Sequence, residues 1–570
     1  MIDNYEGVSE ICVDNLVDSD TTTLAHKFEN FRSLESIDFK GWNTSNVESL
    51  ESCFSKCMAL TRLDLTRWNT SKVKNMKYCF DLCVSLKTIN ANNWDTSNVE
   101  NLEGCFMSCG ALIQLAIANW TTSKVFNMRD CFYDCRSLTS LDLSNWDVSK
   151  VMSLKNCFYN CKSLKVLNIS NWKPSSCVEL DNCFSGCLFL ESLDLSHWDT
   201  HNVKSAAFCF NECVNLRNLD VSGWDTSNIT DLSSCFEETR LKNLDLSSWN
   251  VSNVKSLNSC FYHAKLNNKF DISTWNTHNV TNMAYCFNSS GINKIDLSNW
   301  DVSNLEVLDG CFASCSNLTS VKLSNWNTSN LISMYECFLE CFKLKELDLS
   351  GWNTSNLVVL SHCFYRCESL ERLDIADWDI SNVIYLDHCF QDLIAFFDVS
   401  KWQPISVATL VSCFEGCIIE NEKSETNEAI GRAEIVDSDE YDKQIDKQIM
   451  QFKDDPQTRS HNYYLDLSEW RTPSLVDISS CFKNSVCIEM NLSNWDVSHV
   501  LDARECFATD TLVALDISNW VFDDKCDLND IFKGCDNLTV IYCKKKTFKR
   551  LYEYLPNPEE WTYVNHVARK

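Results

Sequence analysis

Hydrophobic and polar positions recur along this chain in a unit of about 26 residues. A representative copy is LTRLDLTRWNTSKVKNMKYCFDLC, residues 60–83, and its tryptophan marks 18 copies of the unit. Self-similarity at this period is typical of a solenoid, in which each coil can bury its apolar face only against its neighbours. The marker tryptophans are Trp42, Trp68, Trp94, Trp120, Trp146, Trp172, Trp198, Trp224, Trp249, Trp275, Trp300, Trp326, Trp352, Trp378, Trp402, Trp470, Trp495 and Trp520.

A short strand is predicted before each tryptophan. Leu63 and Leu65 alternate with Asp64, and this period of two is expected of a strand with one buried face. Trp68 follows after a brief turn and is expected to form a bulky wall of the core.

A short helix is predicted after each tryptophan. Asn69 to Ser71 supplies side chains of the type that cap a helix start. In another coil, Ser45 to Glu48 matches the S-x-x-E capping box. The apolar positions that follow lie three or four residues apart, as on one face of a helix. They are Val73, Met76, Cys79, Phe80 and Cys83.

The predicted fold class is therefore α/β, as a single leucine-rich-repeat-like solenoid of about 19 coils with one short strand and one short helix per coil. Neighbouring coils are expected to stack about 4.8 Å apart. Representative residues of the expected repeat core are Trp68, Phe80, Trp94, Phe106, Trp146 and Phe158.

Five segments are predicted from interruptions of the repeat. Residues 1–34 form a degenerate N-terminal capping coil with Leu16 in the tryptophan position. Residues 418–462 form a charged insertion, in which a helix is expected around Tyr441 to Phe452. The repeat solenoid occupies residues 35–417 and continues at 463–537, and residues 538–570 form the C-terminal cap.

The net charge of the chain limits the classes of partner that it is expected to bind. A formal net charge of -29 over 570 residues argues against nucleic acid, because a phosphate-binding surface needs a basic stripe. A basic protein partner suits this charge better. The acidic start of the chain lacks the pattern of a secretory signal, and no apolar run is long enough for a membrane span. We expect a monomer.

Two regular positions of the repeat hold 29 of the 34 cysteines. A Cys-Phe pair follows the tryptophan by 11 residues in 17 of the 18 coils, and a second cysteine follows four residues later in 12 coils. Where the second cysteine is missing, residues such as Thr239, Ala264 and Ser290 replace it, which favours a cramped packing position holding reduced thiols. Disulfides between stacked coils remain open, since equivalent positions lie within bonding range.

The repeat L-x-x-L-D-L-S-x-W-D/N-T-S-N-V-x-x-L/M-x-x-C-F-x-x-C-x-x-L resembles that of BspA-type leucine-rich-repeat surface proteins. The resemblance runs from about Leu16 to Cys543, outside the insertion. This chain has Trp where Phe is commoner in that family, and Cys where Met commonly precedes Phe. The resemblance implies a right-handed leucine-rich-repeat-like solenoid with a binding or adhesion role and without catalysis.

An acidic stripe is the strongest candidate for a binding site. The strand residue four before the tryptophan is Asp in 13 of 18 coils, and strand alternation places it on the outer face of the sheet. Stacked carboxylates repel, so either local hydrogen bonds or a basic partner must compensate them. A partner-binding stripe is predicted on the unbroken run of Asp194, Asp220, Asp245, Asp271 and Asp296.

No catalytic or metal-binding set is predicted, and no cofactor is expected. The thiols have no recurring His or acid beside them, and a buried thiol in apolar surroundings is inert. The C-x3-C spacing lies within the permitted range of zinc knuckles, but it is lost in several coils.

The leading hypothesis is a non-enzymatic protein-interaction solenoid that binds a basic partner through the strand face or the insertion. Reduced thiols and the absence of a signal favour a cytoplasmic or otherwise intracellular location. One alternative is a cell-surface or virion-surface adhesin, and a further alternative is a thiol-rich metal or redox store.

Overall fold

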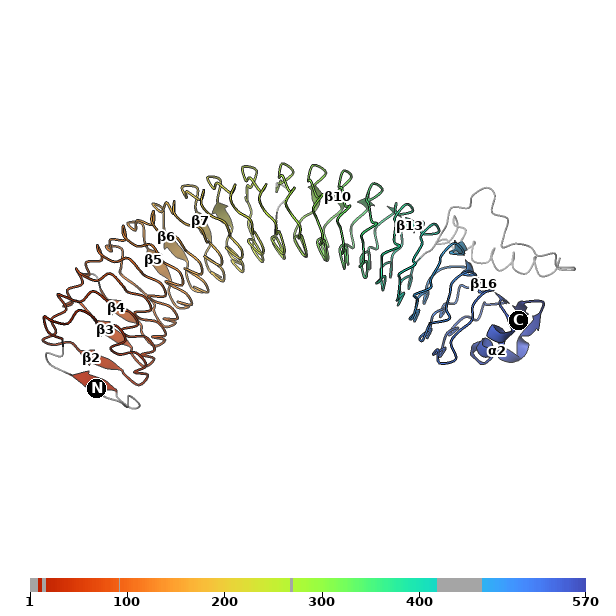
Figure 1. Cartoon of the computed structure of the whole chain (residues 1–570), viewed down its shortest axis with the longest axis horizontal. Coiled ribbons are helices and arrows are strands. Elements are labelled where there is room, and N and C mark those ends of the chain that lie inside the picture. Colours follow the sequence, from red (N-terminus) through yellow and green to blue (C-terminus); the bar gives the residue numbers. More distant parts are fainter. Residues whose placement is uncertain (1–8, 13–16, 92, 267–269, 418–463) are drawn as a thin grey trace. The chain divides into compact units, whose positions relative to one another are not determined.

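The computed structural model describes residues 9–12, 17–91, 93–266, 270–417 and 464–570, which form stacked solenoid coils and a C-terminal cap (Figure 1). The chain divides into two compact units. Unit 1 comprises Met1–Asn282 and Cys286–Ile292, and unit 2 comprises Met283–Tyr285 and Asn293–Lys570. Leu16 and the helix expected around Tyr441 to Phe452 lie outside the described residues.

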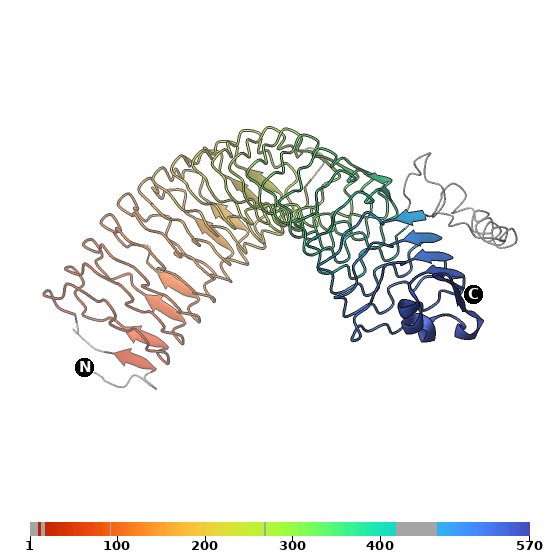
Figure 2. The ribbon, with the colours of Figure 1, turned by 45° about the vertical axis from the view of Figure 1, so that its right-hand side comes forward.

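Unit 1 contains short parallel strands that pair in register from coil to coil (Figure 2). In β3, Leu63 points inward and Arg62 and Asp64 point outward, as the alternation predicts. The strands are β1 (Glu10–Cys12), β2 (Ser36–Asp38), β3 (Arg62–Asp64), β4 (Thr88–Asn90), β5 (Ser140–Asp142), β6 (Val166–Asn168), β7 (Ser192–Asp194) and β8 (Asn218–Asp220).

Unit 2 continues the same coil and ends in a six-stranded sheet of order β14-β15-β16-β17-β19-β18, whose last two pairings are antiparallel. Its strands are β9 (Lys294–Asp296), β10 (Ser320–Lys322), β11 (Glu346–Leu347), β12 (Arg372–Leu373), β13 (Phe396–Phe397), β14 (Tyr464–Asp466), β15 (Glu489–Asn491), β16 (Ala514–Asp516), β17 (Val540–Tyr542), β18 (Thr562–Val564) and β19 (Val567–Arg569). Between β17 and β18 lie α2 (Lys545–Leu551) and the 3-10 turns η1 (Tyr552–Tyr554) and η2 (Pro558–Glu560).

The coils on either side of residues 418–463 stack directly on each other. The rings of Trp402 and Trp470 lie 6.4 Å apart between centroids, and Thr409 pairs with Asp477 in parallel β fashion. The 68 residues between the two tryptophans are therefore compatible with an uninterrupted stack.

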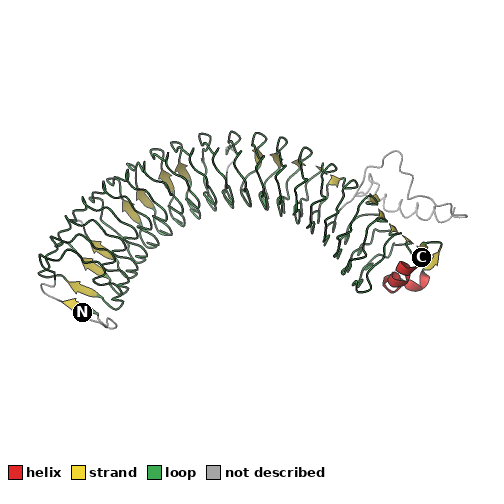
Figure 3. Ribbon diagram, in the orientation of Figure 1, coloured by secondary structure: helices red, strands yellow, loops and turns green. Residues whose placement is uncertain are grey.

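The predicted helix in each coil is wrong. In the described coils the segment after the tryptophan consists of successive turns and a single β-bridge, and α-helix occurs only in α2 near the C-terminus (Figure 3). Asn69 Oδ1 accepts a hydrogen bond from the Ser71 N–H at 3.1 Å, but this closes a local turn and no helix begins there.

Backbone hydrogen bonds between coils explain why the turns replace a helix. The N–H groups of Met76, Tyr78 and Phe80 donate to carbonyl oxygens one coil further on, at 2.8 to 3.0 Å. The intervening N–H groups of Cys79 and Asp81 close turns within the coil, at 3.2 Å. Since the turns and the next coil satisfy these donors, none remains for the bond to the fourth preceding carbonyl that a helix requires.

Residues with left-handed backbone conformation shape the turns that Met76–Cys79 and Phe80–Cys83 form. Tyr78 and Leu82 have φ of 52° and 55°, and each occupies the third position of a hydrogen-bonded turn. This conformation is incompatible with a right-handed helix. The apolar spacing of three and four residues fits both structures, because a turn that closes every three or four residues also returns its side chains to one side.

Stacked aromatic columns form the core of each unit. In unit 1, Trp68 and Trp94 stack with centroids 6.2 Å apart, and Phe80 and Phe106 stack at 5.5 Å. In unit 2, Phe312 and Phe338 stack at 5.5 Å. The structure places all six residues expected in the repeat core inside: Trp68, Phe80, Trp94, Phe106, Trp146 and Phe158 are at most 5% exposed.

Candidate interaction surface

The acidic stripe lies on the outer face of the strands. In unit 1, Asp194 at the end of β7 pairs in register with Asp220 at the end of β8, and both side chains are exposed. Asp245 and Asp271 occupy the same position in the next coils of unit 1 and are also exposed. We call Asp194, Asp220, Asp245 and Asp271 the unit 1 acidic row.

Asp296, the fifth residue of the predicted stripe, belongs to unit 2. It ends β9, and its Oδ2 atom lies 3.0 Å from the Lys322 ammonium at the end of β10. Asp296 therefore belongs to a different unit from the other four residues and has a cationic neighbour of its own.

Each carboxylate of the row binds the turn that follows its strand. Asp194 Oδ1 accepts hydrogen bonds from the Ser196 N–H at 3.0 Å and the Ser196 hydroxyl at 2.7 Å. Asp220 accepts the same pair from Ser222, at 3.0 and 2.6 Å. These bonds hold the junction of strand and turn, so the local role that the sequence left open is present.

At Asp194 and Asp245 the same kind of hydrogen bond favours the ionised carboxylate. Donation from the Ser196 hydroxyl and N–H lowers the pKa of Asp194, and donation from the Ser247 hydroxyl and N–H lowers the pKa of Asp245. Among the described residues, no ion pair within 4.0 Å involves Asp194, Asp220 or Asp245. Local bonding thus coexists with an exposed negative charge on adjacent coils.

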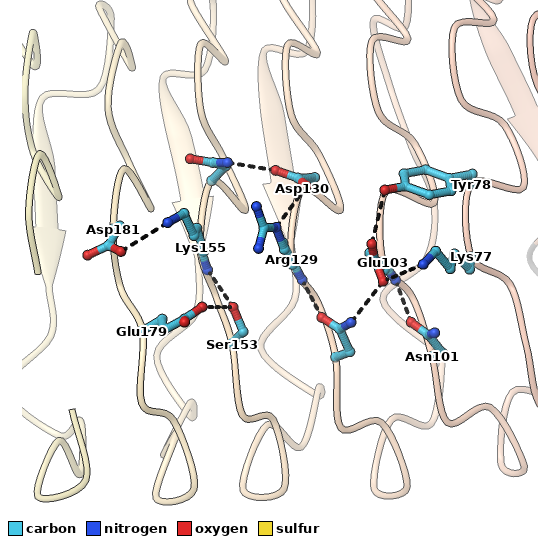
Figure 4. A network of polar contacts seen from close by, with 12 residues as sticks. Lys77, Tyr78, Asn101, Glu103, Arg129, Asp130, Ser153, Lys155, Glu179 and Asp181 are labelled. Carbon is cyan, nitrogen blue, oxygen red and sulfur yellow. Dashed lines mark hydrogen bonds and ion pairs between the residues drawn. The ribbon is translucent and has the colours of Figure 1, made fainter. Parts of the chain in front are cut away.

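A second polar array, on the turns of unit 1, neutralises its own charges. Lys77 forms a 3.0 Å ion pair with Glu103 of the next coil, and the Tyr78 hydroxyl donates to the same carboxylate at 3.0 Å (Figure 4). Lys155 pairs with Asp181 at 3.2 Å in the same way. Because Glu103 and Asp181 are each matched by a lysine one coil away, these ion pairs link the coils and offer little net charge to a partner.

The array continues through amide and hydroxyl groups. It was not predicted from the sequence. Asn127 donates to Glu103 at 3.1 Å, Asn156 to Asp130 at 2.8 Å, and Ser153 to Glu179 at 3.1 Å. The signal was present, since most of these partners are 24 to 26 residues apart and become neighbours when the repeat is aligned coil by coil.

The cysteine columns are buried. Cys79, Cys83 and Cys105 are free thiols with no exposed surface, and burial raises the pKa of each well above its usual range. The Cys83 thiol donates to the carbonyl oxygen of Phe54 at 3.1 Å, and Cys109 donates likewise to Phe80. Where Thr239 replaces the second cysteine, its hydroxyl donates to the carbonyl of Phe236 at 2.7 Å. At Cys83, Cys109 and Thr239 this position therefore holds a small hydrogen-bond donor, whereas Ala264 fills it without one.

Metal sites and membrane spans were considered for the described residues. These residues contain no group of three or more His, Cys, Asp or Glu residues arranged to hold a metal ion. No helix within the described ranges is both long enough and apolar enough to cross a membrane.

Comparison with protein families gives one match that repeats along the chain. The family model described as "Mycoplasma protein of unknown function, DUF285" matches residues 22–141, 127–238, 209–321, 306–427 and 452–545. A search of curated proteins found no match.

Solved structures of bacterial leucine-rich repeat proteins are similar at low identity. A leucine-rich repeat protein from Bacteroides ovatus is 18% identical, with 66% of this chain and 82% of that chain covered and a TM-score of 0.36. A leucine-rich cell surface protein from Faecalibacterium prausnitzii is 16% identical, with coverages of 66% and 83% and a TM-score of 0.29. A leucine-rich repeat protein from Eubacterium ventriosum is 14% identical, with 74% of this chain and 92% of that chain covered and a TM-score of 0.27.

The tandem family matches and the coils of the structure agree on the class of protein. The prediction of a leucine-rich-repeat-like solenoid is confirmed by the tandem family matches and the coils, with turns in place of the helices.

Proposed function

Since this chain belongs to the DUF285 family, whose model matches residues 22–427 and 452–545, we propose that it is a non-enzymatic solenoid that binds a basic protein partner through the unit 1 acidic row. The observation that carries the proposal is the set of exposed carboxylates on adjacent coils, with Asp194, Asp220 and Asp245 outside any ion pair among the described residues.

The physical argument rests on uncompensated repulsion. Carboxylates on adjacent paired strands disfavour each other. Hydrogen bonds from Ser196 and Ser247 hold Asp194 and Asp245 in the charged form, so protonation does not relieve the repulsion at neutral pH. Lysine or arginine side chains of a partner would relieve it, and the net charge of -29 would speed their approach.

The contrast with the turn array favours a binding role for the row. Lys77 and Lys155 neutralise Glu103 and Asp181, which shows that the repeat can place a cation against an acid of the next coil. The acidic row of the same unit has no such pairing at Asp194, Asp220 or Asp245 among the described residues. A partner supplies the missing positive charge.

The test replaces three acids with amides that keep the turn. Asp194→Asn, Asp220→Asn and Asp245→Asn remove charge, and Asn168 already fills this position, accepting from the Ser170 hydroxyl at 3.0 Å. A fluorescent decalysine peptide at about 0.15 M salt is expected to bind the triple variant roughly five-fold more weakly than the wild type, by loss of close Coulomb contacts.

A matched control removes the same charge elsewhere on unit 1. Asp95, Asp147 and Asp225 are exposed, and each caps the serine two residues later. Asn69 fills the same position and makes the same bond. Asp95→Asn, Asp147→Asn and Asp225→Asn should change decalysine binding less than two-fold. Equal weakening by both triple variants would mean that only net charge matters, and the acidic row would not be a site.

We further propose that the protein is intracellular. The alternative location is the cell or virion surface. The proposal is supported by buried free thiols such as Cys79 and Cys105, whose pKa values are raised by burial so that they stay protonated. Thiols trapped with an alkylating reagent during isolation from the native cells should be free, and they should react only after denaturation. A majority of paired cysteines would instead favour the surface-adhesin role.

A further inference from the structure

An exposed row of apolar side chains runs along unit 2. It lies six residues after the marker tryptophan, where the preceding residue is buried and the following one is at least partly exposed. Ile332, Ile384 and Leu501 are 44%, 36% and 51% exposed. Six successive coils carry an apolar residue there: Ile332, Val358, Ile384, Ala408, Val476 and Leu501, which we call the unit 2 apolar row.

Backbone hydrogen bonds hold the row together. The N–H of Val358 donates to the carbonyl of Ile332 at 2.8 Å, and Ile384 donates to Val358 at 2.9 Å. The chain of bonds continues from Ala408 to Ile384, from Val476 to Ala408 and from Leu501 to Val476, at 2.8 to 3.0 Å. The side chains therefore lie one per coil at a spacing of about 4.8 Å, and a partner meets them already ordered.

The repeat provides its own evidence that packing does not require these residues. In unit 1 the same position holds Glu48, Lys74, Lys204 and Lys255, and the backbone bonds are the same, as from Lys74 to Glu48 at 2.8 Å. Lys74 and Glu48 there also form a 2.9 Å surface ion pair. Since charged residues fill this position without disturbing the coil, the apolar residues of unit 2 are not explained by the fold.

Neighbouring residues define the character of the surface. Tyr385, beside Ile384, is 48% exposed and widens the apolar area. At one end of the row, the carbonyl oxygen of exposed Glu306 accepts a hydrogen bond from the Ile332 N–H at 2.9 Å. At the other end Asp477, Asp502 and Asp527 form consecutive bridges in the next position of the coil, with Arg504 paired to Asp502 at 2.6 Å and to Asp527 at 3.7 Å.

This charge pattern decides between occupants. A second copy docked antiparallel along the row would bring its Glu306 end against Asp477, and a parallel copy would oppose Glu306 to Glu306 and Asp477 to Asp477. Like charges at a desolvated edge oppose association. A partner with an apolar stripe flanked by lysine or arginine fits both the row and its acidic ends.

We propose that the unit 2 apolar row is a docking surface for a basic amphipathic α-helix of a partner protein. A helix presents one apolar side chain per turn of about 5.4 Å, close to the coil spacing of about 4.8 Å, so that consecutive turns meet consecutive coils. The inference extends the proposed protein-binding role and uses residues other than the unit 1 acidic row.

The probe is an 18-residue peptide of leucine and lysine with leucine on one helical face, labelled with a fluorophore. Two companion peptides replace all leucines by glutamine or all lysines by glutamate. The wild-type chain is expected to bind the leucine–lysine peptide about ten-fold more tightly than either companion, since each companion lacks one of the two complementary features.

The variant Ile332→Thr, Ile384→Thr, Leu501→Thr should lose this ten-fold preference. Threonine already fills the position at Thr230 and Thr281, so the coil should fold. The matched control Phe126→Thr, Met152→Thr, Val178→Thr removes the apolar residues of the same position in unit 1 and should retain the preference.

Four outcomes would overturn the proposal. They are an equal loss in the unit 1 control, tighter binding of the leucine–glutamate peptide, binding of all three peptides alike, or a wild-type dimer by light scattering that the unit 2 variant abolishes. The last would identify a second copy as the occupant. The Asp194→Asn, Asp220→Asn, Asp245→Asn variant should still prefer the leucine–lysine peptide over its glutamine companion, which separates failure of this inference from failure of the proposed function.

Discussion

The indole N–H of Trp172 donates a 3.0 Å hydrogen bond to the backbone carbonyl oxygen of Leu143, in the coil before it. Trp146 makes the same bond to Ile117 at 3.1 Å. The marker tryptophan therefore both fills the core and links one coil to the next. At Trp198, 2% exposed, the indole nitrogen has no hydrogen-bond partner in the described part of the chain.

This difference predicts unequal costs for the same substitution. Trp172→Phe should lower the free energy of unfolding more than Trp198→Phe, by about 0.5–1.5 kcal/mol, because only the first loses a hydrogen bond. The Leu143 carbonyl still accepts from the Trp146 N–H at 2.9 Å. Both changes remove similar ring volume, so the cavity cost cancels in the comparison. Urea unfolding followed by circular dichroism measures the difference, and equal midpoints would contradict the role of the indole bond.

The buried thiols predict a loss of stability in alkali. Burial raises the pKa of Cys57 and of Cys161 to about 12, whereas an unfolded thiol titrates near 8.5. A group whose folded pKa is raised contributes its full stability below the unfolded pKa and loses it as pH rises toward the folded value. Each such thiol should lower the free energy of unfolding by about 1.4 kcal/mol per pH unit between roughly pH 8.5 and 12.

Urea midpoints at pH 8 and pH 10, with reductant present, measure this effect. The midpoint should fall steeply at pH 10, and Cys161→Ala should show a smaller fall than the wild type because one fewer thiol ionises on unfolding. A midpoint that stays constant over these two pH values would show that the thiols are not protonated and buried as described.

The stacking of the coils was predictable from the sequence, but the path of the chain within a coil was not. The 26-residue spacing of Trp68 and Trp94 predicts adjacent coils, and their rings do stack. The spacing of Val73, Met76 and Phe80 fits a helix as well as a series of turns. The choice depends on N–H groups such as that of Met76, which donate to the next coil, and no pattern inside one repeat reveals a partner in another.

The acidic row was predictable for a similar reason, and its limits were not. Strand alternation places Asp194 and Asp220 outward, and the structure places them there. The separation of Asp296 follows from the division into units and from Lys322, which lies 26 residues away in sequence. Such neighbours become visible only when the repeat is aligned coil against coil.

The left-handed turn positions predict a stabilising substitution. Glu212 is exposed with φ of 57°, and one coil earlier the same position holds Gly186 with φ of 72°. Glu212→Gly should raise the free energy of unfolding by roughly 0.5–1 kcal/mol, because the left-handed conformation costs a non-glycine residue about 1–2 kcal/mol and the extra freedom of glycine in the unfolded chain returns part of it.

Glu191→Gly is the matched control for that substitution. Glu191 is exposed on the same unit and lies outside the left-handed positions, so glycine there should lower stability by about 0.5–1 kcal/mol. Thermal midpoints of the two variants should move in opposite directions. A fall in both would mean that the native turn does not strain Glu212.

Threonines two residues after the tryptophan predict another pair of unequal costs. The Thr96 hydroxyl donates to the Thr121 carbonyl at 3.0 Å and accepts from the Thr121 N–H at 2.7 Å, so it bridges two coils with two bonds. The Thr354 hydroxyl is buried without a hydrogen-bond partner among the described residues. Val148 fills the same position and is 1% exposed, so valine fits there.

Thr96→Val should therefore lower the free energy of unfolding by about 1–3 kcal/mol, since it removes two hydrogen bonds between coils, one to the N–H and one to the carbonyl of Thr121. Thr354→Val should be neutral or stabilising, because it removes a buried hydroxyl that has no partner. Denaturant unfolding of both variants against the wild type measures the two effects. If Thr354→Val cost as much as Thr96→Val, the hydroxyl bridge between coils would contribute nothing beyond the shape of the side chain.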